Sequence, residues 1–283
     1  MSYKTILVQA DDSSNATQRI QAAVKLALKE DARLIGVANT GIARLLHDTL
    51  AIFPDRDNLA PYLPMMKERA TTALTDFENI ARSLGVTTIE TRLLNGEKDT
   101  GISVRARYAD LVIHGQYDPD DPWWRLTSEL PEYVAMNSGT PVLVIPRTGG
   151  LDTLGERVLI GWNNSLQAAR AVHDAIPLLT RATSVHVALF RSTAQSTEIG
   201  AAMSADIGAY LASQGIQADV MQKECNEITE GGMGMLLLKA AAELQADLLV
   251  MGCYGRWRVR EILLGGASRT VLDATTIPVF LAH

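Results

Sequence analysis

Glycines in the last part of the chain have the types and spacing of an anion-binding loop. Gly252 and Gly255 follow an apolar run that ends at Met251, and a further glycine pair stands just before Ser268. Glycine lets a backbone approach a ligand closely, and the first amides of a helix offer unpaired N–H groups and a positive dipole end to an anion. The segment therefore predicts a phosphate cradle made of Gly252, Gly255, Gly265, Gly266, Ala267 and Ser268.

Arginines around this loop strengthen the prediction. The loop and the helix after it contain Arg256, Arg258, Arg260 and Arg269, although the chain has a formal net charge of −6. Guanidinium groups make charge-assisted hydrogen bonds with phosphate, and we expect Arg256 and Arg258 to reach the ligand. Two alternatives stay open. The arginines could form a solvated face that balances Glu261 and Asp273, and the glycines could serve only turns and caps.

Other reactive side chains show no catalytic or metal-binding pattern. Neither the compact Gly-x-Gly-x-x-Gly of dinucleotide sites nor the Gly-Lys-Ser/Thr of the P-loop occurs in the glycine segment. The five histidines lack metal-ligand spacing, and no nucleophile is paired with a base. We therefore predict no catalytic residue and no metal ligand. His114 is interpreted as a hydrogen-bonded histidine near the core, and Cys253, inside the glycine turn, as accessible.

The elements that position the loop occur twice. Residues Ala109–Tyr117 recur as Ala246–Tyr254 with five identities, and Ile6–Ser13 matches Val158–Ser165. Each copy has a short apolar strand pattern followed by a glycine turn, which is where open α/β sheets place ligands. We therefore expect one fold repeated twice, with the functional site at the ends of these strands.

Strand and helix patterns alternate along both copies. Short apolar runs such as Thr5–Ala10 alternate with amphipathic stretches such as Ser13–Leu28, and Ser13 and Ser165 are expected to cap helices. The alternation predicts an α/β fold with a parallel sheet covered on both faces. Because Arg147–Gly150 breaks the pattern, we predict domains at residues 1–147 and 156–283.

Composition fits a globular cytoplasmic protein. Hydrophobic residues make up 47% and charged residues 20% of the 283 positions, which is ordinary globular usage. The net acidic chain, with a pI near 5.4, argues against nucleic acid as the main partner. No apolar run approaches a membrane span and no signal-peptide pattern opens the chain, so we expect a cytoplasmic location. Cys225 and Cys253 are too few for a disulfide framework or a zinc site.

The pattern Gly252-x2-Gly255-x9-Gly265, after an apolar strand, resembles the ATP-binding signature of the universal stress protein family. The segment Gly161–Ser165, with Ala168–Ala171 after it, is similar to that family's first strand and helix. This resemblance implies two tandem HUP/Rossmann-like domains, each with a five-stranded parallel sheet. It also implies an intramolecular pseudo-dimer that packs through the fifth strands, Val142–Ile145 and Val279–Leu281. Pairing two such apolar edges would remove an aggregation hazard.

The resemblance further implies ATP or AMP, with or without Mg²⁺, bound between the first strand and the glycine loop. Trp162, Asn163 and Met251 then join the cradle residues in the site. The implied role is in stress response or signalling, with unidentified protein partners and with a homodimer of whole chains left open. Gly266 stands where the family usually has Ser or Thr, and Asn163 where it commonly has Asp. A scaffold that binds no nucleotide is therefore the alternative, and a slow ATPase a weaker one.

The signature is lost in the first half, which we expect to be a degenerate site. Alignment of the repeats places Asp118 at Gly255, Ser128 at Gly265 and Glu129 at Gly266. The acidic segment 118–122 would repel phosphate, although Asp11 keeps the family's carboxylate. Clustered carboxylates suit Mg²⁺ or Ca²⁺, but a solvated acidic loop is the favoured interpretation.

Overall fold

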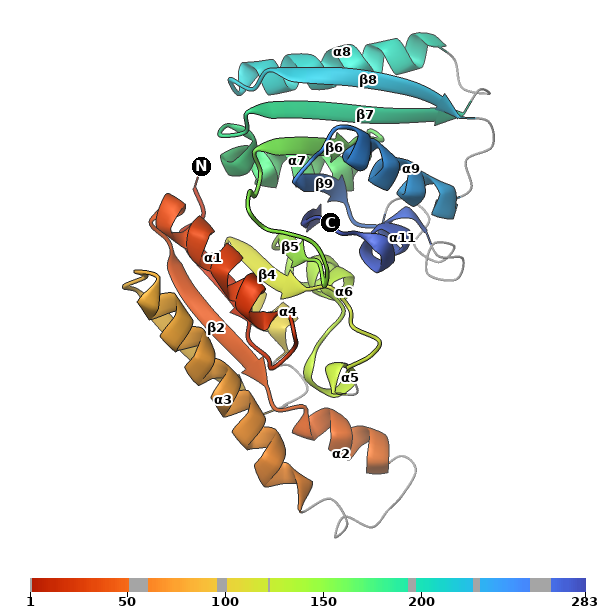
Figure 1. Cartoon of the computed structure of the whole chain (residues 1–283). Coiled ribbons are helices and arrows are strands. Elements are labelled where there is room, and N and C mark those ends of the chain that lie inside the picture. The colour runs from red at the N-terminus through yellow and green to blue at the C-terminus, as the bar shows by residue number, and fades with distance from the viewer. Residues whose placement is uncertain are drawn as a thin grey trace. The chain divides into compact units, whose positions relative to one another are not determined.

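The computed structural model describes residues 2–50, 61–95, 101–121, 123–192, 197–225, 230–254 and 266–283. The chain divides into two compact units, Ser2–Val142 and Leu143–His283, which are described separately below (Figure 1). Both units are α/β, so the predicted fold class is confirmed for each.

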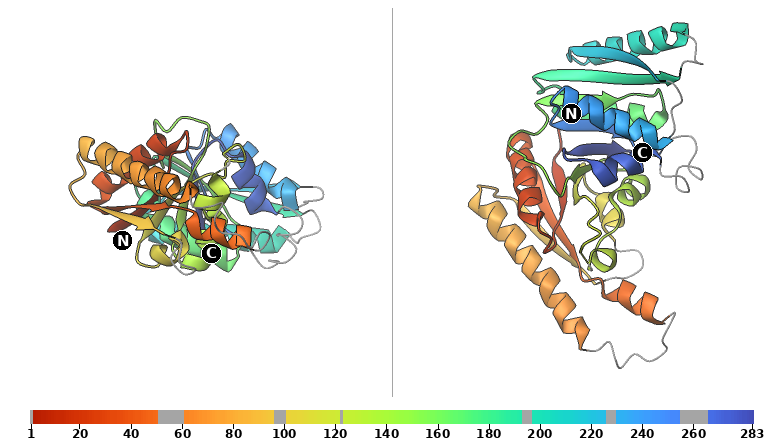
Figure 2. Two further views of the ribbon diagram at one scale, coloured as in Figure 1. Left: turned by 90° about the horizontal axis from the view of Figure 1, so that it is seen from below. Right: turned by 45° about the vertical axis from the view of Figure 1, so that its right-hand side comes forward.

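The first unit contains a parallel sheet in the order β3-β2-β1-β4. Its strands are β1 Thr5–Gln9, β2 Arg33–Asn39, β3 Ile89–Leu94 and β4 Leu111–Gly115. Its helices are α1 Ala16–Glu30, α2 Ile42–Leu50, α3 Tyr62–Ser83, α4 Ile102–Ala106, α5 Trp124–Thr127 and α6 Pro131–Ser138. The long helix α3 packs beside α1, and α4 packs with α6 (Figures 1 and 2). Strand β5, Val142–Ile145, contains the boundary between the units.

The second unit repeats the arrangement, with parallel strands in the order β10-β9-β6-β7-β8. Its strands are β6 Arg157–Gly161, β7 Ser184–Ser192, β8 Ala218–Cys225, β9 Leu248–Gly252 and β10 Val279–Ala282. Its helices are α7 Leu166–Leu179, α8 Thr197–Ser213, α9 Glu230–Glu243 and α11 Ala267–Ala274. Strands β9 and β10 are almost wholly buried, which explains why they are apolar at consecutive positions. The packing of the two units through their fifth strands stays a prediction.

The repeated aspartate has the same structural role in both units. The Asp110 carboxylate accepts the backbone N–H groups of Lys4 and Thr5, both at 2.8 Å. The Asp247 carboxylate likewise accepts the N–H groups of Glu156 and Arg157, at 3.2 and 2.9 Å. Each aspartate therefore pins the start of the first strand beside the fourth. Because this role is structural, it explains the recurrence of the Ala-Asp-Leu segment, and no ligand is needed for the explanation.

Two local predictions are wrong. Ser13 does not cap α1, because Asn15 is the N-cap residue and the Ser13 hydroxyl instead donates to Asp11 Oδ1 at 2.5 Å. Cys253 is fully buried rather than accessible. By contrast, Ser165 caps α7 as predicted, since its Oγ accepts the Ala168 N–H at 3.1 Å.

Candidate functional site

A cleft opens at the carboxyl ends of the strands of the second unit. It encloses about 580 Å³, part of which is open solvent. One wall follows β6 and contains Gly161, Trp162 and Asn163. The wall across from it is made by the end of β9 and the start of α11, and β7 and α9 complete the lining with Ala188, Phe190, Met233 and Leu237. The structure therefore brings together six predicted site residues: Trp162, Asn163, Met251, Gly252, Ala267 and Ser268.

The N-terminus of α11 adjoins this cleft. Gly266, the buried N-cap residue, makes no side-chain capping bond, so the first-turn amides of this eight-residue helix have no cap from that position. Ser268 is buried, and its Oγ accepts the N–H of Tyr254 at 3.2 Å, which ties the turn after β9 to the helix. Uncapped amides at the positive end of a helix dipole suit an anion.

Gly252 has a packing role that the sequence reading missed. A Cβ added at this position would lie 2.6 Å from the backbone N of Ala168 and 2.7 Å from the backbone carbon of Gln167. The end of β9 therefore meets the first turn of α7 too closely for any side chain. At Gly161, by comparison, an added Cβ would lie 3.0 Å from Leu237 Cδ2, a side-chain atom of the cleft wall.

The turn after β6 holds Trp162 and Asn163 at the cleft. The Trp162 N–H donates to Ala188 O at 3.0 Å, and the Asn163 Oδ1 accepts the Ser165 N–H at 3.1 Å. The indole Nε1 of Trp162 is buried and has no hydrogen-bond partner among the described residues. The asparagine therefore helps to start α7, while the tryptophan brings an unused donor to the wall of the cleft.

The remaining predicted site residues, Gly255, Arg256, Arg258 and Gly265, lie outside the described residues. Arg269 is described and is half-exposed. Its Nε lies 3.5 Å from Asp273 Oδ2, one turn along α11. That ion pair agrees with the solvated-face interpretation for this arginine.

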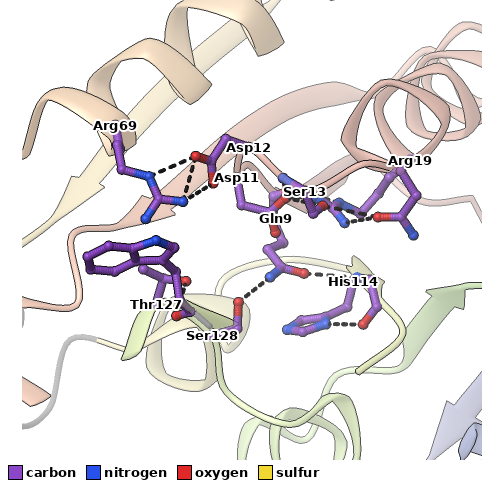
Figure 3. Close-up of polar contacts among 12 residues, drawn as sticks. Gln9, Asp11, Asp12, Ser13, Arg19, Arg69, His114, Thr127 and Ser128 are labelled. Carbon is purple, nitrogen blue, oxygen red and sulfur yellow. Dashed lines mark hydrogen bonds and ion pairs between the residues drawn. The ribbon is translucent and has the colours of Figure 1, made fainter. Parts of the chain in front are cut away.

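The corresponding edge of the first unit is closed by its own side chains (Figure 3). Gln9, which aligns with Gly161, is 2% exposed. Its Oε1 accepts the Gly115 N–H at 2.8 Å, and its Nε2 donates to Ser128 Oγ at 2.5 Å. The Gln9 side chain thus spans the space between β1 and the segment before α6, which the second unit leaves open at Gly161.

A buried ion pair occupies the position behind Gln9. Arg19, on α1, is 1% exposed and its Nη2 lies 2.5 Å from Asp11 Oδ1, while its Nε donates to Gln9 O at 2.9 Å. Burial alone would raise the pKa of the Asp11 carboxyl, but the Arg19 guanidinium and hydrogen bonds from Ser13 hold it below its usual value. Asp11, the carboxylate that the family resemblance would place in a ligand site, is therefore paired with Arg19 of the same unit. The second unit has Ala171 where the first has Arg19.

A second pair of charges, Arg69 and Asp12, lies at the same edge of the first unit. The Arg69 guanidinium donates to both carboxylate oxygens of Asp12, at 2.8 and 2.6 Å, and its Cζ lies 4.5 Å from the centre of the Trp123 ring (Figure 3). Glu129, which aligns with Gly266, accepts the Ser103 N–H at 2.8 Å. A carboxylate of the chain thus binds the backbone at the start of α4.

His114 is a core residue, as predicted. It is fully buried, its Nδ1 donates to Gly115 O at 2.8 Å, and its Nε2 has no partner among the described residues. Burial lowers the pKa of the imidazole to about 4, so the ring is neutral near pH 7. The neighbouring Trp124 is 4% exposed and meets the ring of Tyr117 edge-on at 4.8 Å, which makes it a packing anchor.

The model of the universal stress protein family matches residues 155–283. Residues 155–283 form a universal stress protein domain. The whole chain also shares its fold with a universal stress protein from Archaeoglobus fulgidus, at 18% identity and a TM-score of 0.71, over 98% of this chain and 95% of that one. A putative universal stress protein from Pseudomonas aeruginosa aligns at 18% identity and a TM-score of 0.62, over 99% and 93% of the two chains. Among curated proteins, none matches this chain.

The fold of this domain thus occurs twice in the chain, the first time in a half that the family model does not match. Across the described residues, no helix is both long enough and apolar enough to cross a membrane. Sequence reasoning missed Gln9, Arg19 and Arg69. Comparison with the second copy marks Gln9 and Arg19, because these long polar side chains stand where the second copy has Gly161 and Ala171, but it does not show where the side chains point.

Proposed function

We propose that the second unit binds an adenine nucleotide, ATP or AMP, in the cleft between β6 and α11, and that the protein acts in stress response or signalling. The observation that carries the proposal is the meeting of residues from three distant segments around one open cleft. One segment follows β6, one ends β9 and one begins α11. The glycine pattern and the family resemblance predict the site residues that these segments contain.

The cleft suits a nucleotide in three ways. Phe190, Met233 and Leu237 give an apolar wall against which a base can pack, and Trp162 adds a ring with a free N–H donor. The uncapped amides of α11 suit a phosphate. Gly161 leaves the floor without a side chain. The described residues therefore fit the ligand, and Arg256 and Arg258 would add positive charge from the loop between β9 and α11.

The first unit is proposed as a degenerate partner that binds no nucleotide. Gln9, Glu129 and the Arg69–Trp123 contact occupy the space that a base and phosphates would need. The carboxylates of Asp11 and Asp12 at the same edge are already paired with Arg19 and Arg69. The function proposed is binding of the nucleotide, without a defined catalytic reaction.

Mass spectrometry of small molecules released from denatured, purified protein tests this proposal. We expect ATP or AMP at up to one equivalent per chain, or its uptake after addition to stripped protein. If neither retention nor uptake of adenine nucleotide is detected, the interaction scaffold becomes the better account. Steady production of ADP at a rate that scales with protein would instead favour the slow ATPase.

A further inference from the structure

A second pocket of the C-terminal unit lies between α7 and α8. It encloses about 680 Å³, part of it open solvent, and is lined mainly by Trp162, Ala169, Val172, Ile207 and Tyr210. Val172 and Ile207 are 1% and 3% exposed, so they form its floor, whereas Ala169 and Tyr210 are exposed at its sides. The part of this space that compares with known cavities, about 360 Å³, lies at the lower end of the range of small-molecule sites, roughly 300–1,000 Å³.

The two copies of the fold differ at this place. In the first unit α1 packs directly against α3, whereas among the described residues the equivalent helices α7 and α8 are barely in contact. Val172 on α7 aligns with the buried Ile20 of α1, so the floor is apolar in both copies. In the second unit, therefore, the apolar surface of α7 is not covered by α8 as the surface of α1 is covered by α3.

The chemistry of the lining defines what would fill this space. The walls are mainly aliphatic carbons and the rings of Trp162 and Tyr210, with the half-exposed imidazole of His173 beside them. Burial of an apolar molecule is therefore favourable, at about 25 cal/mol per Å² of apolar surface removed from water. The exposed carboxylate of Asp206 belongs to the same lining and disfavours an anion. A whole helix, about 10 Å across, is too wide for a space lined only by the end of β6 and two helix faces.

We propose that the pocket between α7 and α8 is a ligand site for an uncharged, largely apolar small molecule. Trp162 lines both this pocket and the nucleotide cleft, so its indole reports on occupancy of either one. The proposal does not rest on nucleotide binding, and its test uses protein without nucleotide.

The probe is 2-naphthol, compared with 2-naphthoate, which has the same rings and a negative charge. Binding is followed in the full chain by calorimetry and by the indole N–H resonance of Trp162, identified by its loss in Trp162→Phe. Ala169→Phe places a ring in the pocket from an exposed helix position, and Ala242→Phe, on the exposed face of α9, is the matched control. Tyr210→Ala removes one wall as a second, independent variant.

We expect 2-naphthol to bind and to shift the Trp162 resonance, with 2-naphthoate weaker by about tenfold or more. Ala169→Phe and Tyr210→Ala should each weaken 2-naphthol by a similar factor, and Ala242→Phe should not. The proposal is overturned if 2-naphthol fails to bind at millimolar concentration, or if it binds all variants equally. It is also overturned if the wild type self-associates on concentration and Ala169→Phe abolishes that, because the occupant is then a second copy of the chain.

Discussion

The side-chain amide of Gln9 donates a 2.5 Å hydrogen bond to the hydroxyl of Ser128, across the carboxyl edge of the first-unit sheet. The aligned positions in the second unit are both glycine, Gly161 and Gly265. The two side chains that bond across the edge of the first unit are thus replaced in the second unit by glycines, which have no side chain. This contrast explains physically how a duplicated fold can keep one closed edge and one open cleft.

Placing the bracing side chain in the open cleft should block it. We expect Gly161→Gln to lower ATP affinity by about tenfold or more, because its side chain enters the cleft beside Leu237. Gln9→Ala should leave ATP affinity unchanged while destabilising the first unit by about 1–3 kcal/mol through lost partners for Gly115 and Ser128. Calorimetric titration and thermal unfolding measure both effects. Equal ATP loss in the two variants would contradict the asymmetry.

The loop arginines should act on phosphate and not on the base. Arg256→Ala and Arg258→Ala should each weaken ATP by about ten- to a hundredfold, since charge-assisted hydrogen bonds contribute roughly 1.5–3 kcal/mol. Adenosine affinity should hardly change. Comparison of the two ligands by calorimetry decides the matter. Parallel losses would mean a packing effect, and no loss in either variant would return both residues to a solvated face.

The Asp11–Arg19 pair should be far more important for stability than the nearby Asp12–Arg69 pair. Asp11→Asn leaves Arg19 buried without its counter-charge and should cost about 3–5 kcal/mol of unfolding free energy. Asp12→Asn removes a half-exposed carboxylate and should cost about 0–1 kcal/mol. Because the folded pKa of Asp11 is lowered, its contribution is present above the ordinary value of 3.8 and is lost below it. Denaturant unfolding of the two variants provides the comparison, and similar losses would refute the ranking.

His114 should make the protein less stable in mild acid. Its folded pKa of about 4 lies below the ordinary 6.5, so the unfolded chain takes up the proton first as pH falls through this interval. The stability present above pH 6.5 should therefore decline by on the order of 3 kcal/mol by pH 4. His114→Met, which introduces the residue of the second copy, should flatten this decline, whereas the exposed His173→Gln should not. Urea midpoints across this pH range give the answer, and an unchanged slope in His114→Met would argue against the assignment.

The sequence predicted the fold, and six of the residues that it assigned to the candidate site lie around one cleft. Apolar runs and repeated segments predicted the strands, because burial on both faces leaves a continuous apolar pattern. Trp162 and Met251 were implied by the family resemblance, and Ser268 was predicted from the glycines that precede it at a helix start. The roles of Gln9 and Arg19 could not be predicted, since a long polar side chain on a helix or strand does not reveal whether it points into a pocket. For Gly252 the sequence predicted a role in ligand binding but not its close contact with α7. That contact depends on tertiary packing, which the spacing of the glycines does not encode.

The most direct test of the account is a calorimetric titration of ATP into the full chain and into two matched variants. Gly265→Asp adds a side chain and a negative charge to the proposed cradle, while Ser128→Ala alters the aligned residue of the first unit. We predict one site per chain for the wild type, no measurable binding for Gly265→Asp and wild-type affinity for Ser128→Ala. Absence of ATP binding in the wild type, or equal binding by all three proteins, would contradict the central claim that the second unit alone holds the nucleotide.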